Sequence, residues 1–470
     1  MTTRSLRRIS LDTDCGRVAL QCPGRRGLLE IRQTGYGVSA LMQILRRNTA
    51  SPSPSRAQQL REAILLTFCE YKTPECKRLQ NVSSSEWQQL LYWLDTSGLA
   101  LYFLDHITQL ESSEILPPTV LSRLQQNLID NTARTNKMIA ESVSIHHSFQ
   151  EAGLSYATLK GFSLWPVSVP KPELRSQLDL DFLMAEESAS KARQILEARG
   201  YRLHAISGRS WEFKIYQNEP STLKDIYKAT LQSTVELHIE TAGTSAKALL
   251  PCREKLCFHD ACMPVLPPAE LFLGQGMHLY KHVCSEFFRV AHMIEFRRHI
   301  IARYHDNSFW IRLRELSEGN TRIPISLGFV TLLISQTMGD FAPEAFTCWT
   351  VDRLPSAARL WIELYGRQTV YANFPGSKLY LLLQRELRGA GLPAKRSLHA
   401  ALLPRRLPPA ITRGVPGETL HQRIRRYCKQ IRFILFRLKF HIVEGFHYLK
   451  ESDRWQQHMN DLEGLGSDDL

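Results

Sequence analysis

The sequence predicts an α+β fold in which a small α/β core lies between two helical regions. Three short segments read as strands: 155–159, which is mainly apolar, and 178–184 and 234–239, which alternate apolar and polar residues as half-buried strands do. The residues on both sides of this block repeat apolar side chains at helical spacing. At 470 residues the chain is too long for one hydrophobic core, so we expect two or three domains.

Five segments follow from these patterns. Residues 1–56 show little periodicity and end in a proline- and serine-rich run, which predicts a poorly structured arm and linker. Residues 57–153 predict a helical lead-in, and residues 154–245 predict the α/β core. Residues 246–400 predict a helical domain, and residues 401–470 predict a proline-broken linker followed by a basic helix.

The core contains the residues with the most informative spacing. Asp179 and Asp181 are two positions apart on a predicted strand, so their side chains leave the sheet on the same face, roughly 6.5–7 Å apart at Cα. Glu236 and His238 likewise share one face of a later predicted strand. Carboxylate oxygens are the ligands that Mg²⁺ prefers. The spacing therefore predicts that Asp179, Asp181 and Glu236 share a divalent cation, although a solvated acidic strand face would show the same pattern.

A possible phosphate-binding turn precedes this strand. Lys160 and Gly161 follow an apolar segment, and glycine permits a close approach of the backbone to a ligand. Backbone N–H groups at the start of a helix attract phosphate oxygens. Further along, a predicted helix over 188–199 ends at Gly200, a typical C-terminal stop.

Together these motifs resemble the family called uncharacterised nucleotidyltransferases, a distant branch of the DNA polymerase beta-like nucleotidyltransferase superfamily. The resemblance covers about residues 60 to 315 and includes helical segments on both sides of the core. It is carried by Trp87-Gln88, Leu90-Leu91, Asn131, Ala133, Asn136, Ala152-Gly153-Leu154, Leu159-Lys160-Gly161, Leu164, Pro170, Pro172, Leu174-Arg175, Asp179-Leu180-Asp181, Gly200-Tyr201, Glu236-Leu237-His238, His278, His282 and Val290-Ala291-His292-Met293-Ile294-Glu295.

The resemblance implies a small mixed sheet flanked by helical regions and a nucleotidyltransferase activity. A nucleoside monophosphate would pass from a nucleoside triphosphate to an unknown acceptor, with release of pyrophosphate. Asp179, Asp181 and Glu236 would be the catalytic metal ligands for Mg²⁺, with Mn²⁺ as a substitute. His238 would orient Glu236 or the acceptor, although a histidine on a strand face can equally fill a polar pocket. The predicted nucleotide-binding residues are Lys160, Gly161, Ser163 and Arg175.

Three positions depart from the family pattern. Leu178 stands where the family usually has a glycine, Val169 where relatives often have a tyrosine, and Phe162 separates Gly161 from Ser163. The carboxylates are retained, but the phosphate-binding loop is altered. The alternative interpretation is therefore a catalytically degenerate sensor or partner protein in a biosynthetic assembly, which keeps the fold without turnover.

Histidine and cysteine clusters suggest metal sites less strongly. His278 and His282 are four residues apart on a predicted helix, but Leu279 stands where a zinc protease has glutamate. We expect these histidines to pack together or to form a positive rim around the nucleotide pocket. Ten cysteines without a dense framework predict reduced thiols in a cytoplasmic protein. The five-residue spacing of Cys252, Cys257 and Cys262 does not match a structural zinc site.

Net charge and hydropathy bear on partners. The net charge is +13, and basic residues gather in the C-terminal segment among aromatic and aliphatic ones. Three interpretations account for this segment: a helix that packs on the core and has a solvated basic face, a helix that binds an anionic membrane surface, or a helix that binds a nucleic-acid backbone. No apolar run is long enough for a signal or a membrane span, since 325–334 reads as a buried helix. The segment's basic residues are Arg423, Arg425, Arg426, Lys429, Arg432, Arg437 and Lys439.

Overall fold

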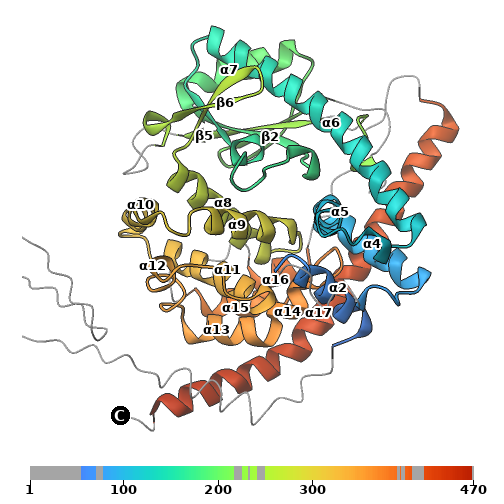
Figure 1. Cartoon of the computed structure of the whole chain (residues 1–470), viewed down its shortest axis with the longest axis vertical. Coiled ribbons are helices and arrows are strands. Elements are labelled where there is room, and N and C mark those ends of the chain that lie inside the picture. Colours follow the sequence, from blue (N-terminus) through green and yellow to red (C-terminus); the bar gives the residue numbers. More distant parts are fainter. Residues whose placement is uncertain are drawn as a thin grey trace, which may run out of the picture.

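The computed structural model describes residues 54–69, 78–215, 225–230, 233–240, 249–388, 392, 397–404 and 418–467. Residues 1–53 of the arm predicted at 1–56, and residues 405–417 of the proline-broken linker, lie outside these residues. In the described part, the fold is α+β, as the sequence predicts: a mixed sheet packs beside a larger helical body (Figure 1).

Within the residues that the structure describes, the chain enters the fold through four α-helices. They are α2 (Arg56–Leu66), α4 (Ser84–Ser97), α5 (Ala100–Gln109) and α6 (Pro118–Glu151), with a 3₁₀ turn at Ser113–Ile115. Ser55 and Ser83 cap α2 and α4 through capping boxes, which satisfy backbone N–H groups at each N-terminus. Gly98 ends α4 at a φ of 76°, a left-handed conformation that glycine adopts without strain.

A seven-stranded mixed sheet forms the core, in the order β3-β4-β5-β2-β1-β7-β6. Strand β2 runs parallel to β5 and antiparallel to β1, while β7 runs parallel to β1. The strands are β1 (Tyr156–Leu159), β2 (Asp179–Ala185), β3 (Arg202–Ser207), β4 (Ser210–Lys214), β5 (Thr234–Glu240), β6 (Glu254–Phe258) and β7 (Ala261–Val265). The strands predicted at 155–159, 178–184 and 234–239 are present as β1, β2 and β5.

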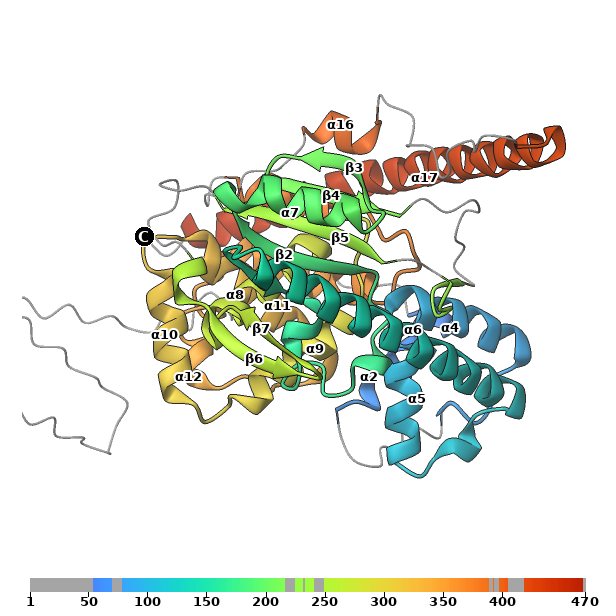
Figure 2. The same ribbon diagram turned by 90° about the horizontal axis from the view of Figure 1, so that it is seen from above.

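The alternation of side chains divides β2 and β5 into two faces. Leu180 and Phe182 on β2, with Val235 and Leu237 on β5, are buried in one hydrophobic core. Helix α6 and helix α7 (Glu186–Ala198) cover this face (Figures 1 and 2). The intervening polar residues therefore emerge on the opposite face, toward the helical body.

The sheet extends past the predicted core boundary at residue 245. Strands β6 and β7 form a hairpin within the segment predicted to be helical. In this hairpin, Cys257 and Cys262 are cross-strand partners 4.1 Å apart at Cα and form a disulfide. The expectation that all cysteines are reduced is therefore wrong. Their five-residue spacing reflects a hairpin register that brings the two β-carbons together, which the sequence did not indicate.

The described residues after β7 are mainly helical. Their elements are α8 (Pro268–Val283), α9 (Ala291–Ala302), α10 (Asn307–Ser317), α11 (Arg322–Met338), α12 (Glu344–Thr347), α13 (Ser356–Trp361), a π-helical turn (Ile362–Gly366), α14 (Arg367–Val370), α15 (Tyr380–Glu386), α16 (Leu398–Leu402) and α17 (Leu420–Ser467). Further 3₁₀ turns lie at Gly161–Leu164, Pro172–Leu174 and Leu250–Cys252. Among the described residues, no helix combines the length and apolarity that a membrane span needs.

The helices before and after the sheet share one hydrophobic core. Leu94 and Phe103 from the lead-in belong to the same buried cluster as Phe296 and Trp361 from the tail. Arg61 on α2 donates a 2.5 Å hydrogen bond to the carbonyl of Tyr371, 310 residues later in the chain. The two predicted helical regions thus form one helical body against which the sheet packs.

Candidate active site

Three carboxylates from two neighbouring strands lie on the polar face of the sheet. In the parallel pairing of β2 with β5, Asp181 lies directly opposite Glu236, and Asp179 is two residues earlier on β2. Asp181, Glu236 and His238 offer ligand atoms that all lie within 4.8 Å of one another. The shared face predicted from the alternation is therefore present.

Asp181 is the best-connected of these residues. Its Oδ1 atom accepts hydrogen bonds from Lys160 Nζ and from His238 Nε2, both at 2.9 Å. Burial would raise the pKa of Asp181, but the hydrogen bond from His238 and the charge of Lys160 outweigh it and lower that pKa to about 2. Asp181 is thus held as an anion, although its side chain is only 2% exposed.

The pKa values of Asp179 and Glu236 shift in the opposite direction to that of Asp181. Burial, and then repulsion by Asp181, raise the pKa of both carboxyls. Lys160 neutralises one negative charge, which leaves excess carboxylate on this face of the sheet. A hard divalent cation with oxygen ligands would relieve the repulsion, so the donor set fits Mg²⁺ or Mn²⁺.

The turn after β1 positions Lys160. Lys160 and Gly161 both have a φ of 50°, and a β-carbon at Gly161 would collide with the side-chain amide of Gln177. Ser163 is buried and donates a 2.7 Å hydrogen bond to the carbonyl of Lys160. Gly161 and Ser163 therefore shape the turn and are not among the residues that line the cavity described below. Their predicted phosphate contacts stay predictions.

Arg175 connects the sheet side to the helical body. Its Nε atom donates to Glu295 Oε1 on α9 at 2.9 Å, and its Nη1 atom donates to Gln177 Oε1 at 3.1 Å. Tyr102 also donates to Glu295 Oε1, at 3.1 Å. Part of the guanidinium fork that the sequence assigned to phosphate is thus occupied by a buried carboxylate.

A cavity of about 490 Å³ separates the two sides. Its sheet wall is formed by Lys160, Asp179 and Asp181, with Arg175 at its edge. We call the opposite side the helical wall, and it consists of His278, His282, Arg289, His292 and Glu295. Glu236 and His238 are half-buried on β5 beside Asp181 and do not line this cavity.

The comparison with protein families matches residues 83–332 to the family described as uncharacterised nucleotidyltransferase. This match covers more than half of the chain. The chain belongs to this family.

The match includes every strand of the sheet as well as α8 and α9, so both walls of the cavity lie within the nucleotidyltransferase region. Helix α17 lies outside it. No curated protein matches the sequence. Among solved structures, an antigenic nucleotidyltransferase-like protein from Paracoccidioides brasiliensis is 12% identical, with 43% of this chain and 93% of that chain covered and a TM-score of 0.26. No site residue is transferred from that protein.

The helical wall contains residues that sequence reasoning did not place in the site. In the sequence, His292 and Glu295 stand out only as part of the family motif, and no pattern marks Arg289. Three-residue spacing puts His292 and Glu295 on one face of α9, which was a usable signal. The direction of that face depends on how α9 packs against the sheet, which local spacing does not encode.

Proposed function

We propose that this nucleotidyltransferase moves a nucleoside monophosphate from a nucleoside triphosphate to an acceptor hydroxyl, with Mg²⁺ or Mn²⁺ as cofactor. The observation that carries this proposal is the convergence of Asp179, Asp181 and Glu236 beside a cavity of about 490 Å³. That volume is within the range of about 300–1,000 Å³ of small-molecule sites. We expect the protein to work in the cytoplasm.

In the proposed reaction, an acceptor oxygen forms a bond to the α-phosphorus while the bond from that phosphorus to the bridging oxygen of the β-phosphate breaks. Pyrophosphate leaves, and the acceptor proton passes to a base, for which Glu236 beside Asp181 is the candidate. A cation held by the three carboxylates would neutralise phosphate charge and lower the pKa of the attacking hydroxyl.

Cationic side chains on both walls support a triphosphate ligand. Lys160 lines the cavity from the sheet, and Arg289 lines it from the loop before α9. Asp179 lies close enough to Arg289 to affect its pKa, although burial has the larger effect and lowers that pKa. Both cations could contact phosphate oxygens, and Arg289 offers the planar fork that suits a bidentate contact.

One observation favours a second candidate function. Asp181 Oδ1 is already engaged by both Lys160 and His238, so two residues of this protein occupy an oxygen that a metal would use. A sensor or assembly partner that binds nucleotide without turnover would tolerate such an arrangement. This alternative retains the cavity and its cations but assigns no reaction to the carboxylates.

Pyrophosphate release tests the two candidates. The protein is incubated with each of the four common nucleoside triphosphates, Mg²⁺ and a panel of hydroxylated small molecules, proteins and RNA ends. We expect release with at least one combination and a loss of about 10³-fold or more in the double variant Asp179→Asn, Asp181→Asn.

A matched control removes two charges elsewhere. Asp340 and Asp352 are exposed, so Asp340→Asn with Asp352→Asn should leave release unchanged. Circular dichroism verifies that each variant is folded. Nucleotide binding by calorimetry without release across the whole panel would favour the sensor, and equal release from both double variants would refute the assignment of the carboxylates.

A further inference from the structure

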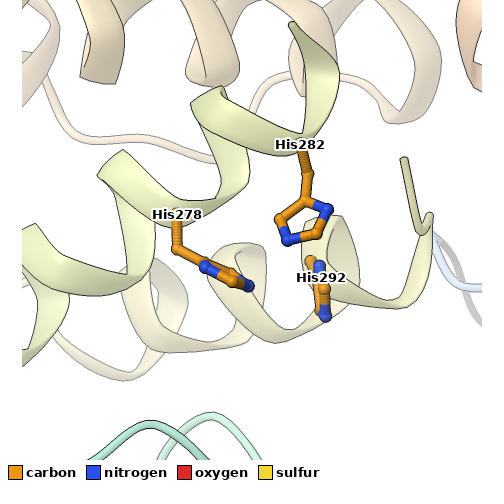
Figure 3. A group of neighbouring side chains, drawn as sticks. All are labelled: His278, His282 and His292. Atoms are coloured by element: carbon orange, nitrogen blue, oxygen red, sulfur yellow. The ribbon is translucent and has the colours of Figure 1, made fainter. Parts of the chain in front are cut away.

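Three histidines form a compact group on the helical wall (Figure 3). His278 and His282 lie one turn apart on α8, and His292 lies at the start of α9. The ring centroids are 4.3 Å apart for His278 and His282, and 5.3 Å apart for each of these with His292. One ring nitrogen from each residue lies within 4.8 Å of the other two.

The hydrogen bonds of these rings favour metal binding. His282 Nδ1 donates to the carbonyl of Phe287 at 2.9 Å, which leaves the lone pair of His282 Nε2 available. His292 Nδ1 is buried and has no hydrogen-bond partner in the described structure. A buried ring nitrogen without a partner is costly, and a metal ion would satisfy it.

Burial also favours the neutral form of the three imidazoles. It is the main reason that the pKa of His278 falls to about 2, and it lowers the pKa values of His282 and His292 as well. Neutral imidazoles do not form the positive rim that the sequence suggested for His278 and His282. They do offer the unprotonated nitrogens that a metal requires.

We propose that His278, His282 and His292 bind one late first-row divalent metal of the Zn²⁺ class, with its remaining coordination position open to the cavity. Nitrogen ligands favour Zn²⁺ over Mg²⁺, so this site is chemically distinct from the carboxylates. Three protein ligands and one open position are typical of reactive zinc sites. Tetrahedral coordination needs nitrogens about 3.4 Å apart, so metal binding requires the rings to move closer together.

Metal binding tests this site without relying on enzymatic activity. Untagged full-length protein is stripped with a chelator, dialysed and titrated with Zn²⁺ by calorimetry, and with Co²⁺ by visible absorption. We expect one equivalent to bind, with a tetrahedral Co²⁺ spectrum. Replacing either His282 or His292 by alanine should weaken Zn²⁺ binding by about 100-fold or more.

Two controls isolate the histidines. His305 is exposed, so His305→Ala should bind Zn²⁺ as the wild type does. The variant with both Asp179→Asn and Asp181→Asn should also keep its Zn²⁺. If an alanine variant unfolds, the corresponding asparagine variant replaces it. Absence of a bound equivalent, or equal affinity in the His282 and His305 variants, would overturn the proposal.

A separate observation concerns α17. Ten large apolar residues on this helix are between 47% and 72% exposed, and all of them except Val443 form three groups that repeat every eleven residues. Eleven residues make almost exactly three helical turns, so the residues form a nearly straight stripe about 44 Å long. We call them the apolar stripe, and its members are Leu420, Ile424, Tyr427, Ile431, Leu435, Leu438, Ile442, Phe446 and Leu449.

Basic residues border the apolar stripe. At 100° per residue, four exposed cations lie about 90° around the helix from the stripe: Arg425, Arg432, Lys439 and Lys450. Residues 420–450 contain eight Lys and Arg but a single acidic residue, Glu444. The helix packs onto the body through other positions, including Tyr448 and Trp455, and one end of α17 projects past the body (Figure 2).

Charge complementarity selects the occupant of this surface. A second copy of α17 would bring the same excess positive charge against its own. A nucleic-acid backbone would satisfy the cations but leave the apolar residues exposed. We propose that α17 binds an anionic lipid surface, with the apolar stripe in the acyl boundary and the basic flank among the head groups.

Vesicle sedimentation tests this proposal. Full-length protein should bind vesicles of phosphatidylcholine and phosphatidylserine at least about 10-fold more tightly than phosphatidylcholine alone. Leu435→Glu with Phe446→Glu should abolish binding. The control Gln88→Glu with Gln89→Glu adds the same charge at exposed positions on α4 and should still bind.

The same variants identify the other occupants. Sedimentation velocity without lipid would reveal a second copy if a concentration-dependent dimer were lost in the Leu435→Glu, Phe446→Glu variant. A gel shift with duplex DNA or RNA would reveal nucleic acid. Either result in a protein that does not bind anionic vesicles would overturn the lipid assignment.

Discussion

The two walls of the cavity differ in their ligand chemistry and in how far their polar groups are satisfied. The sheet wall presents carboxylate oxygens, and Asp181 accepts hydrogen bonds from both Lys160 and His238. The helical wall presents imidazole nitrogens, and His292 Nδ1 has no partner in the described structure. The oxygen set suits a hard cation and the nitrogen set suits a softer one, so one cavity could hold two different metals.

Arg175 and Glu295 join the two walls, and their ion pair should give the largest effect on stability. Their side chains are 15% and 2% exposed. Arg175→Met would leave Glu295 buried without its cation, so we expect a loss of about 3–5 kcal/mol in the free energy of unfolding. Urea denaturation followed by circular dichroism measures it.

The pair Arg193 and Glu197 on α7 provides the matched control, because it is an exposed (i, i+4) ion pair. Arg193→Met should cost about 0.3–0.5 kcal/mol. Adding Glu295→Leu to Arg175→Met should recover much of the stability, since it removes the stranded charge. A loss below about 1 kcal/mol for Arg175→Met alone would mean that the walls are not held together by this pair.

Glu236 should separate the functions of the two walls. Glu236→Gln removes a carboxylate that faces Asp181, so pyrophosphate release should fall by about 10²–10³-fold, or about 3–4 kcal/mol. Zn²⁺ binding by the histidines should not change, because it depends on α8 and α9. Both readouts are taken on one preparation, with the exposed Glu344→Gln as control. Loss of both pyrophosphate release and Zn²⁺ binding in Glu236→Gln would show that the two walls form one metal site.

The same contrast explains what the sequence could predict. The sheet wall follows from local alternation: Asp179 and Asp181 share a face because they are two residues apart, and the resemblance to the family placed Glu236 with them. The helical wall depends on packing between helices. His282 and His292 are ten residues apart on different helices, and no local rule brings their rings together. The hairpin of β6 and β7 was missed for a related reason, because its pairing with β1 is non-local.

His146 is a buried histidine outside the cavity, and it tests how such a residue contributes to the pH dependence of stability without a metal. Its Nδ1 atom lies 2.9 Å from the hydroxyl of Tyr156, and its Nε2 atom lies 3.3 Å from that of Thr158. Burial lowers its pKa from about 6.5 to about 4. Below pH 6.5 the unfolded state therefore takes up the proton first, and stability falls as the pH decreases toward 4.

We expect this histidine to account for about 3 kcal/mol of the stability lost between pH 6.5 and 4. The measurement compares urea denaturation of wild type and His146→Gln across this range, since other buried histidines contribute equally to both proteins. The variant should lose less stability on acidification, and Zn²⁺ should not alter the difference. Parallel curves would mean that His146 does not titrate in this way.

A much smaller effect than that of Arg175 should come from a second ion pair on the same loop. Lys171 Nζ lies 2.6 Å from Asp105 Oδ1 on α5, but the side chain of Lys171 is 46% exposed. Water and salt screen this pair, so Lys171→Met should cost at most about 1 kcal/mol, and less at high ionic strength. Urea denaturation at low and high salt measures both values. Lys171 and Arg175 both connect this loop to the helical body. The ratio of the losses in unfolding free energy for the two Met variants therefore measures how much burial strengthens an ion pair. Equal losses for the two variants would place the strength of the connection in the loop backbone and not in the buried charge.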